Sequence, residues 1–331
     1  YRLLHWGYVC SVRRLAHLPG LQKELFQMRG LWIGLFTALG MMFLESCSNQ
    51  AAETAGSSRF DSGTLYISCD ESFKPVIDAQ VQVFQNDYPK AKIVVQYKPE
   101  VDCLRDFLVD SIRMVIVTRP YTPGEKRLIA DSLKLDTDYA TVAYDAIAVV
   151  VHPQATDSLF TMNEIRDLLS GYSKKNLIPV LDGVRATSTV RFMLDSVLRN
   201  QPLGKNVVAA NSSREVVDYV ARTPRAVGFV GSSWVGNIDD TAQINQLNKV
   251  RLARVESTDS AGGFVLPVQY LIYTRTYPMI RSLVYVQKGK EQGIAGSLAN
   301  FLRNDRGQLI FRRSYLFPAI RPFYMRDAQT E

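Results

Sequence analysis

The chain has 331 residues, of which 47% are hydrophobic and 21% are charged, a composition typical of a folded globular protein. Its 39 Lys and Arg residues outnumber 32 Asp and Glu residues, but residues 1–46 hold five of the basic and two of the acidic side chains, so the remainder carries a net charge of only +4. This charge is mild and dispersed, and no basic stripe with interleaved aromatic residues accompanies it. We therefore expect no nucleic-acid partner.

A short apolar leader occupies residues 28–46. Met28 offers a start, and residues 31–44 form an uncharged apolar run that is short for a membrane span. Cys47 then follows a pattern that resembles the cleavage site of bacterial lipoproteins, although Glu45 stands where a small or apolar residue is usual. We predict a lipoprotein signal peptide, a lipidated Cys47 and a mature domain on the periplasmic side of a bacterial membrane. The alternative is an uncleaved anchor or a buried helix.

The segments on either side of the leader are set apart from the fold. Residues 1–27 precede the internal Met28 and are interpreted as an upstream extension; the alternative is a cytoplasmic tail before an uncleaved anchor. Residues 47–59 are small and polar, which predicts a flexible tether. About 270 residues remain, enough for two lobes of ordinary size.

After the tether, short β-rich runs alternate with helical patterns, as expected of parallel α/β sheets. Capping boxes, with Glu three residues after a hydroxyl residue, predict helix starts at Thr122, Thr161 and Ser212. The predicted strands cover residues 65–68, 92–97, 114–117, 143–151, 226–230 and 281–287.

Two cysteines follow Cys47 in the chain, Cys69 and Cys103. Both are expected near strand ends on one side of a sheet. An oxidising compartment permits a disulfide between them, but two cysteines do not by themselves establish one.

Residue patterns that carry catalysis are missing from the predicted mature chain. His152 is its only histidine, and a strand end before Pro153 favours a structural role. The sequence contains no G-x-S-x-G, S-x-x-K, H-E-x-x-H or P-loop motif, no Cys/His cluster for zinc and no calcium loop. We therefore expect no enzyme activity, no catalytic residues, no metal and no cofactor, which makes a binding protein the candidate.

The first candidate binding segment lies where the strand at 65–68 gives way to a helix near Phe73. The free amides of a first helical turn carry partial positive charge, and the Ser72 hydroxyl adds a donor, so an oxyanion could bind there. Alternatively, Ser72 only caps its own helix.

The second candidate segment leads from Asp182 into a helix. Three hydroxyl residues in a row, Thr187, Ser188 and Thr189, stand at the helix start, with Arg185 before them. Hydroxyls and amides can donate to an oxyanion, and an arginine adds charge-assisted bonds. Ordinary helix capping is the alternative. If both segments bind, the ligand would be clamped between two lobes that close by hinge motion.

The order of these segments resembles the phosphate-binding proteins of bacterial ABC importers. The resemblance implies an α/β, two-lobe periplasmic binding protein type II fold with two hinge crossover strands. Lobe 1 would comprise residues 60–145 and 280–331, and lobe 2 residues 146–279. The motifs that carry it are SGTLYISCDESFKP, SIRMVIVTRPYTPGE, AYDAIAVVVHP, ATSTVRF, AVGFVG, YPMIRSLVYVQKG and FLRNDRGQLI.

The same resemblance implies ligand-binding residues. Ser72 and Phe73 match the family's Thr-Phe pair, and residues 187–189 match its Ser-Gly-Thr at the second helix start. Arg185 stands in for the phosphate-binding arginine, although it lies two residues closer to the helix than the family pattern has it.

Two positions depart from the family pattern. The Asp that accepts the proton of hydrogen phosphate falls at Arg113, and residues 98–102 replace a Gly/Ser-rich loop. A buried carboxylate acceptor favours a protonated oxyanion over sulfate, because sulfate would leave the carboxylate unpaired. We hypothesise that Glu100 supplies this acceptor; a solvated loop acid is the alternative.

These observations predict a lipid-anchored, monomeric solute-binding protein that captures inorganic phosphate or a related oxyanion for the permease subunits of an ABC importer. The alternative is a degenerate family member that acts as a sensor or interaction protein without tight phosphate binding. An extracytoplasmic hydrolase is a third class, which lacks a visible nucleophile–base pair.

Overall fold

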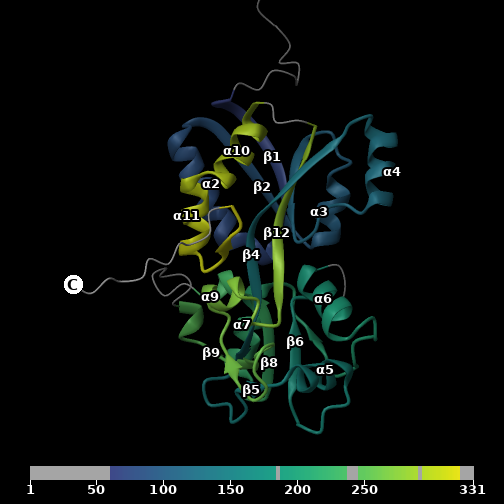
Figure 1. Ribbon diagram of the computed structural model, residues 1–331, viewed down its shortest axis with the longest axis vertical. Helices are drawn as coiled ribbons and strands as arrows, with labels where there is room; N and C mark the ends of the chain where they lie inside the picture. The colour runs from purple at the N-terminus through teal and green to yellow at the C-terminus, as the bar shows by residue number, and fades with distance from the viewer. Residues whose placement is uncertain (1–59, 184–186, 237–244, 290–292, 321–331) are drawn as a thin grey trace, which may run out of the picture. The chain divides into compact units, whose positions relative to one another are not determined.

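The computed structural model describes residues 60–183, 187–236, 245–289 and 293–320 (Figure 1). The predicted leader, Cys47 and the tether lie outside these ranges, and so does Arg185. None of the helices within them combines the length and the apolar character that a bilayer crossing requires.

Two lobes meet along two long strands, β4 (Thr137–Val151) and β12 (Ile280–Lys288) (Figure 1). The strand order of the main sheet is β2-β1-β3-β12-β4-β8-β6-β7. The first part of β4 pairs with β12, whereas Ile147–Val151 pair with β8 of the other lobe. β4 therefore passes from one lobe into the other, which confirms the two-lobe α/β fold with crossover strands. The lobe boundaries at 145/146 and 279/280 stay a proposal.

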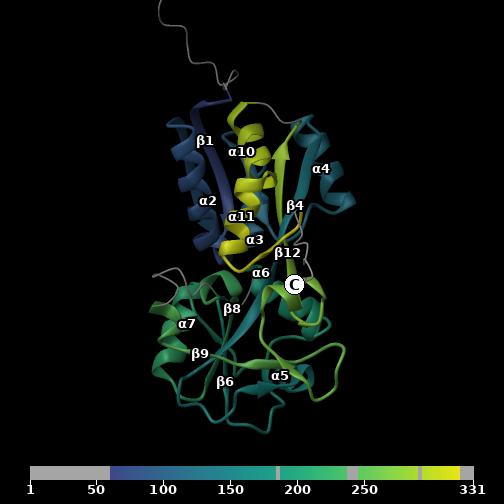
Figure 2. The ribbon, with the colours of Figure 1, turned by 60° about the vertical axis from the view of Figure 1, so that its left-hand side comes forward.

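The first lobe is a sheet with helices on both faces. Helices α2, α10 and α11 cover one face and α3 and α4 the other, as two views show (Figures 1 and 2). β3 is buried on both faces: Met114 and Ile116 pack with the first group, Val115 and Val117 with the second. The elements are β1 (Ser62–Asp70), a 3-10 turn (Glu71–Phe73), α2 (Lys74–Asp87), β2 (Lys90–Lys98), α3 (Glu100–Asp106), β3 (Ile112–Val117), α4 (Pro123–Leu133), α10 (Gly293–Arg303), α11 (Asp305–Arg313) and β13 (Phe317–Pro318).

The second lobe has two cores of its own. One lies between β4, β8 and helices α5, α6 and α9, and the other between the sheet and α7. A small sheet of β11, β10 and β5 completes the lobe. The elements are β5 (Leu159–Phe160), α5 (Met162–Ser170), β6 (Ile178–Leu181), α6 (Ser188–Phe192), a π turn (Met193–Val197), β7 (Val208–Ala209), α7 (Ser213–Arg222), β8 (Ala226–Gly231), a 3-10 turn (Ser232–Trp234), β9 (Arg251–Leu252), β10 (Arg254–Glu256), β11 (Phe264–Val265) and α9 (Gln269–Tyr273).

The predicted strands all occur, but the sheet is mixed rather than parallel. β12 runs antiparallel to both β3 and β4, and β4 runs antiparallel to β8. The reason is that the two crossover strands carry the chain in opposite directions between the lobes. The alternation of strands and helices in the sequence does not indicate that β12 returns antiparallel to its neighbours.

The capping boxes at Thr122 and Thr161 form as predicted, with reciprocal side-chain and backbone bonds. At Ser212 the hydroxyl accepts from the Glu215 amide, but the Glu215 carboxylate bonds the Asn211 amide, one residue before the cap. The third box is therefore only half formed.

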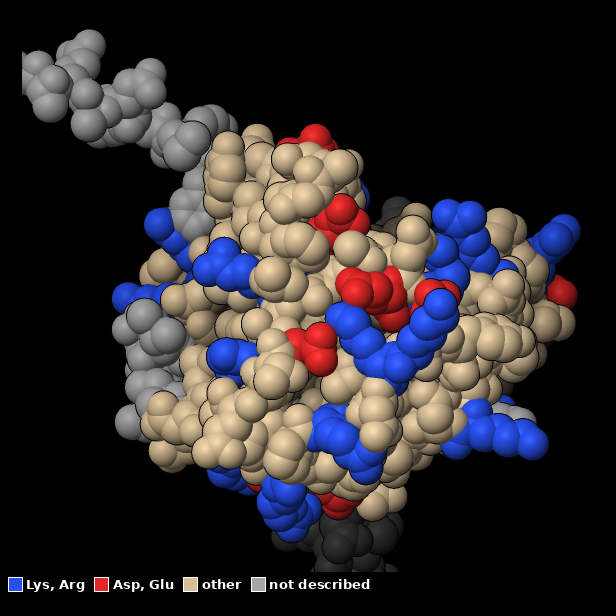
Figure 3. All heavy atoms as spheres, turned by 90° about the horizontal axis from the view of Figure 1, so that it is seen from below, with Lys and Arg blue, Asp and Glu red and all other residues tan. Residues whose placement is uncertain are grey.

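The lower end of the second lobe mixes both signs of charge (Figure 3). In this lobe, for example, Lys175 bonds both Asp157 and Glu164, at 3.0 and 2.9 Å. The arrangement matches the dispersed charge of the sequence.

Candidate functional site

The first predicted binding segment connects β1 to α2. Asp70 ends the strand, and its Oδ1 accepts a hydrogen bond from the Ser72 amide at 2.9 Å. That amide is therefore not free for a ligand, contrary to the expectation for this turn. Ser72 is 1% exposed, and its hydroxyl faces the other lobe, 3.4 Å from Asp182 Oδ2 and 3.4 Å from Ser188 Oγ. Phe73 is fully buried beside it.

The second predicted segment begins α6 with a hydroxyl cluster. Thr187 caps the helix by accepting from the Val190 amide at 3.1 Å, and its own hydroxyl donates to Asp182 Oδ1 at 2.8 Å. The Thr189 hydroxyl donates to Asp182 Oδ2 at 3.1 Å. A π turn follows directly in this helix, an irregularity that is frequent at functional sites.

The two predicted segments are therefore brought together across the lobes. Ser72 comes from the first lobe, and Ser188 and Thr189 from the second, and all three are at most 1% exposed. The hydroxyls meet at the Asp182 carboxylate, which follows β6. We call Ser72, Thr187, Ser188 and Thr189 the hydroxyl cradle.

Arg281, on β12, adds a buried cation to the cradle. Its Nη1 donates to Ser188 Oγ at 2.8 Å and to Thr189 Oγ1 at 3.3 Å. Its Nε donates to Asp145 Oδ2 at 2.9 Å, and its guanidinium carbon lies 4.7 Å from the centre of the Phe73 ring. Arg281 and Asp145 stand directly opposite each other on β12 and β4.

Sequence reasoning missed Arg281 and Asp145, although a signal was present. Each is a charged residue in an otherwise apolar predicted strand, in AYDAIAVVV and in RSLVYVQ. Charges in buried strands are rarely left unpaired, so the two belong together. Asp145 Oδ1 is occupied by the Ser232 amide and hydroxyl, at 3.1 and 2.6 Å.

Among the residues that the structure describes, three buried acids stand near Arg281. Asp70, Asp145 and Asp182 are each at most 5% exposed. Burial raises the pKa of Asp70 to about 7, with a smaller contribution from the charge of Glu100. Burial likewise raises the pKa of Asp182, against the bonds from Thr187 and the charge of Arg281. Among the described residues, Asp70 Oδ2 has no hydrogen-bond partner.

Glu100 begins α3 and is 1% exposed. Its Oε1 accepts from the Thr118 amide at 2.8 Å, and its Oε2 accepts from Arg191 Nε of the second lobe at 2.6 Å. Burial opposes ionisation of Glu100, but Arg191 and Thr118 outweigh it and hold the pKa below its ordinary value. The alternative that Glu100 is a solvated loop acid is therefore wrong. Both of its carboxylate oxygens already accept hydrogen bonds from protein donors.

Arg113 does not join the cleft. It stands exposed near the start of β3, whereas Thr118 follows the opposite end of that strand, where the cleft contacts lie. Arg113 is therefore not brought together with the other predicted ligand residues, and it does not occupy the place of the family's proton acceptor.

Further bonds cross between the lobes beside the cradle. Trp234 Nε1 donates to the Ser72 carbonyl at 2.9 Å. The Glu71 carboxylate accepts from the Ser213 amide and hydroxyl, at 3.2 and 2.9 Å. The described cleft is closed by contacts that the protein makes with itself.

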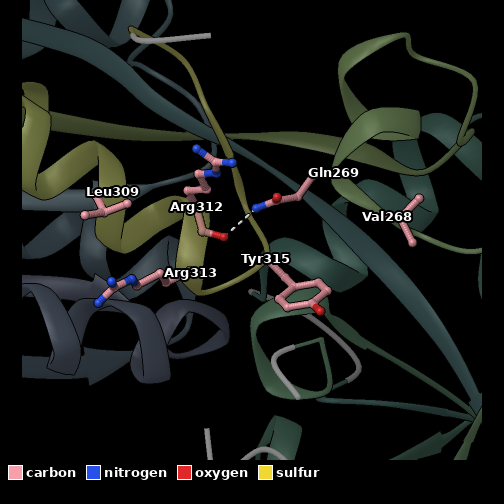
Figure 4. Close-up of a pocket in the computed structure, with 6 residues that line it drawn as sticks. All are labelled: Val268, Gln269, Leu309, Arg312, Arg313 and Tyr315. Atoms are coloured by element: carbon pink, nitrogen blue, oxygen red, sulfur yellow. Dashed lines mark hydrogen bonds between the residues drawn. The ribbon is translucent and has the colours of Figure 1, made fainter. Parts of the chain in front are cut away.

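A surface hollow of about 540 Å³ lies apart from the cradle, between α9 and α11 (Figure 4). Gln269 Nε2 donates to the Arg312 carbonyl at 2.5 Å across it. Its lining is Val268, Gln269, Leu309, Arg312, Arg313 and Tyr315. None of these residues belongs to the cradle.

The histidine and the two cysteines of the described ranges lie apart from the cradle. No group of three His, Cys, Asp or Glu side chains there could hold a metal ion. Cys69 and Cys103 are buried free thiols, and burial raises both pKa values. His152 Nδ1 accepts from the Gln154 amide at 3.1 Å, a local structural bond.

Comparison with known families and structures gives one family. A model described as the PBP superfamily domain matches residues 52–305. No curated protein matches the sequence.

Several solved structures share the fold. One is a putative phosphate ABC transporter substrate-binding protein with bound phosphate from Clostridium perfringens, with a TM-score of 0.64 and 17% identity over 78% of this chain and 100% of that one. Another is an ABC-type phosphate transport receptor from Vibrio cholerae, with a TM-score of 0.56 and 15% identity over 77% of this chain and 99% of that one. At such identities the likeness concerns the fold, and at that level it confirms the resemblance predicted from the sequence.

Proposed function

The chain belongs to the PBP superfamily, and from this premise we propose that it is an extracytoplasmic solute-binding protein that captures inorganic phosphate or a related oxyanion between its lobes. One observation carries the proposal: buried hydroxyls from both lobes and the buried guanidinium of Arg281 converge at one point in the cleft. Neutral donors together with a buried cation suit a small anion that is taken out of water.

In this proposal each part of the site has its own task. Ser72, Thr187, Ser188 and Thr189 donate hydrogen bonds to the anion's oxygens, and Arg281 supplies the positive charge. Closing of the lobes removes water, which strengthens these bonds. Phe73 packs on the Arg281 guanidinium and holds it in place.

The protein acceptor for a protonated oxyanion is better assigned to Asp70 than to Glu100. Both oxygens of Glu100 already accept from Thr118 and Arg191, whereas Asp70 Oδ2 has no partner among the described residues. A buried unpaired oxygen favours a ligand that brings a proton, because a hydrogen bond then replaces an unsatisfied group.

The test is titration calorimetry of the purified protein with phosphate, sulfate and molybdate. Ser72→Ala and Thr189→Ala should each weaken phosphate binding by about 1–3 kcal/mol, because a buried donor to the ligand is lost. Ser257→Ala, which removes an exposed hydroxyl outside the cradle, serves as the control and should leave affinity unchanged. Absence of heat with all three anions would dispose of the proposal.

The proposal has three further parts. The protein delivers its ligand to the permease subunits of an ABC importer, it is a monomer, and a lipid at Cys47 anchors it on the periplasmic side of the membrane. The family match and the shared fold with phosphate transport receptors support the first of these. Masses of the mature N-terminus with and without Cys47→Ala would test the anchor. We propose no catalytic activity.

The second candidate is a family member without tight phosphate binding that acts as a sensor or interaction protein. The observation that favours it is the set of three buried acids near Arg281 in the described part of the cleft. Calorimetry separates the two, because only the first requires heat with an oxyanion.

A further inference from the structure

The Asp182 carboxylate lies at the point where the hydroxyl cradle converges. It is 5% exposed and accepts from Thr187 at 2.8 Å and from Thr189 at 3.1 Å. The third hydroxyl, that of Ser72, reaches it from the other lobe at 3.4 Å. A carboxylate is itself a small oxyanion, and here it receives the set of bonds that an external oxyanion would receive.

The Thr187 and Thr189 hydroxyls cannot donate to Asp182 and to an external anion at the same time. A Ser or Thr hydroxyl has one hydrogen to donate. While Thr187 and Thr189 donate to Asp182, they cannot donate to a ligand. An anion that uses the cradle must first take these hydrogens from the carboxylate.

Charge acts in the same direction. Asp70, Asp145 and Asp182 are all buried. Burial alone would lower the pKa of Arg281, but all three acids lie close enough to it for their charges to raise that pKa. A second anion placed beside an ionised Asp182 would meet repulsion that little solvent screens.

We propose that Asp182 is a built-in competitor for the cradle, which occupies the donors that a ligand would need and lowers the protein's affinity for oxyanions. The inference rests on the proposed function and deepens it by naming the residue that sets affinity. Ligand binding then requires the Asp182 side chain to leave the hydroxyls.

The test compares phosphate binding by Asp182→Ala and the unaltered protein in titration calorimetry. Removing the carboxylate releases three hydroxyl donors and also removes a negative charge from the site. Phosphate should therefore bind at least about tenfold more tightly. Asp157→Ala is the matched control: it removes the same charge from a surface pair with Lys175, and affinity should stay unchanged. Asp182→Asn, which keeps the volume, should shift affinity in the same direction by less and replaces the Ala variant if that one does not fold.

The outcomes separate this inference from the proposed function. If the unaltered protein binds phosphate and Asp182→Ala binds equally or more weakly, Asp182 assists the ligand and the inference is overturned while the function stands. If only the variant binds phosphate, the inference is supported and the unaltered protein belongs to the weakly binding alternative.

If neither protein binds phosphate, the proposed function fails and a second measurement decides the inference. Formate, a free carboxylate, should raise the unfolding temperature of Asp182→Ala more than that of Asp157→Ala, since it restores the missing acceptor. Equal responses of the two variants would overturn the inference.

Discussion

Single residues in the cleft combine deep burial with charge, and Asp70 illustrates the consequence. Its pKa is raised to about 7 in the folded protein, mainly by burial, whereas an unfolded chain has an ordinary Asp value near 3.8. Between these values the folded state binds a proton that the unfolded state has released. Stability from this group is therefore full below the unfolded pKa and is lost as the pH rises towards about 7.

We predict that Asp70→Asn removes this pH dependence. The amide keeps an acceptor for the Ser72 amide hydrogen but cannot ionise. Urea unfolding at several pH values between about 4 and 8 should show the variant gaining stability relative to the unaltered protein as pH rises. A constant difference across that range would contradict a raised Asp70 pKa.

At the residue scale the sequence identified the hydroxyls but not their charged partners. Ser72 and residues 187–189 were found because hydroxyl residues cluster at helix starts. The sequence around Asp182 indicates no role for its carboxylate, and Arg281 lies in a strand whose other residues are mostly apolar. Their roles depend on contacts between segments about a hundred residues apart, which local patterns do not encode.

At the scale of elements, α10 and α11 pack closely at one glycine. A Cβ on Gly307 would lie 2.1 Å from the Phe301 carbonyl oxygen and 2.9 Å from the Leu302 Cα, both backbone atoms that cannot turn aside. The Gln80 amide also donates to the Gly307 carbonyl at 2.8 Å, which ties α2 to the same place.

We predict that Gly307→Ala destabilises the protein by about 1–3 kcal/mol or more, because the helices must separate to admit the methyl group. Gly124→Ala in α4 is the matched control, since nothing lies within 4 Å of its added Cβ. The control should be neutral or stabilising by up to about 1 kcal/mol. Equal thermal unfolding of the two variants would contradict the packing argument.

Elements with strong local signals were predicted well, and short ones were not. β1, β2, β3 and the capped helices α4 and α5 follow from apolar runs and capping residues. β5, β7, β9 and β11 have two residues each, too few for a periodic pattern. Their strand character comes from pairing with neighbours rather than from their own residues.

For the molecule as a whole, the Glu100–Arg191 pair connects the two lobes. Glu100 is 1% exposed and Arg191 comes from α6 of the second lobe. Removing the Glu100 charge takes the charge-assisted bonds from Arg191, which is about a third exposed and keeps its second partner Asp195, so the cost lies between that of a surface pair and that of a fully buried pair.

We predict that Glu100→Gln lowers the free energy of unfolding by about 1.5–3 kcal/mol, the range for a lost hydrogen bond to a charged group. Asp195→Asn is the control, because Asp195 pairs with the same Arg191 at 3.4 Å but is half exposed. Its loss should cost no more than about 1 kcal/mol. Urea titration of both variants provides the comparison, and similar midpoints would mean that Glu100 does not hold the lobes together.

The position of Arg281 and Asp145 on the two crossover strands has a mechanical consequence. Rotation about an axis displaces atoms in proportion to their distance from it, and these two residues face each other within the β4–β12 ladder that joins the lobes. If the lobes rotate about these strands, the pair lies next to the axis. Moving the lobes apart would break the contacts of Ser72 with Asp182 and Ser188 but would leave the Arg281–Asp145 pair intact. We therefore expect Arg281 to keep Asp145 as its counter-charge whether the lobes are together or apart, so that opening would not leave this buried cation unpaired.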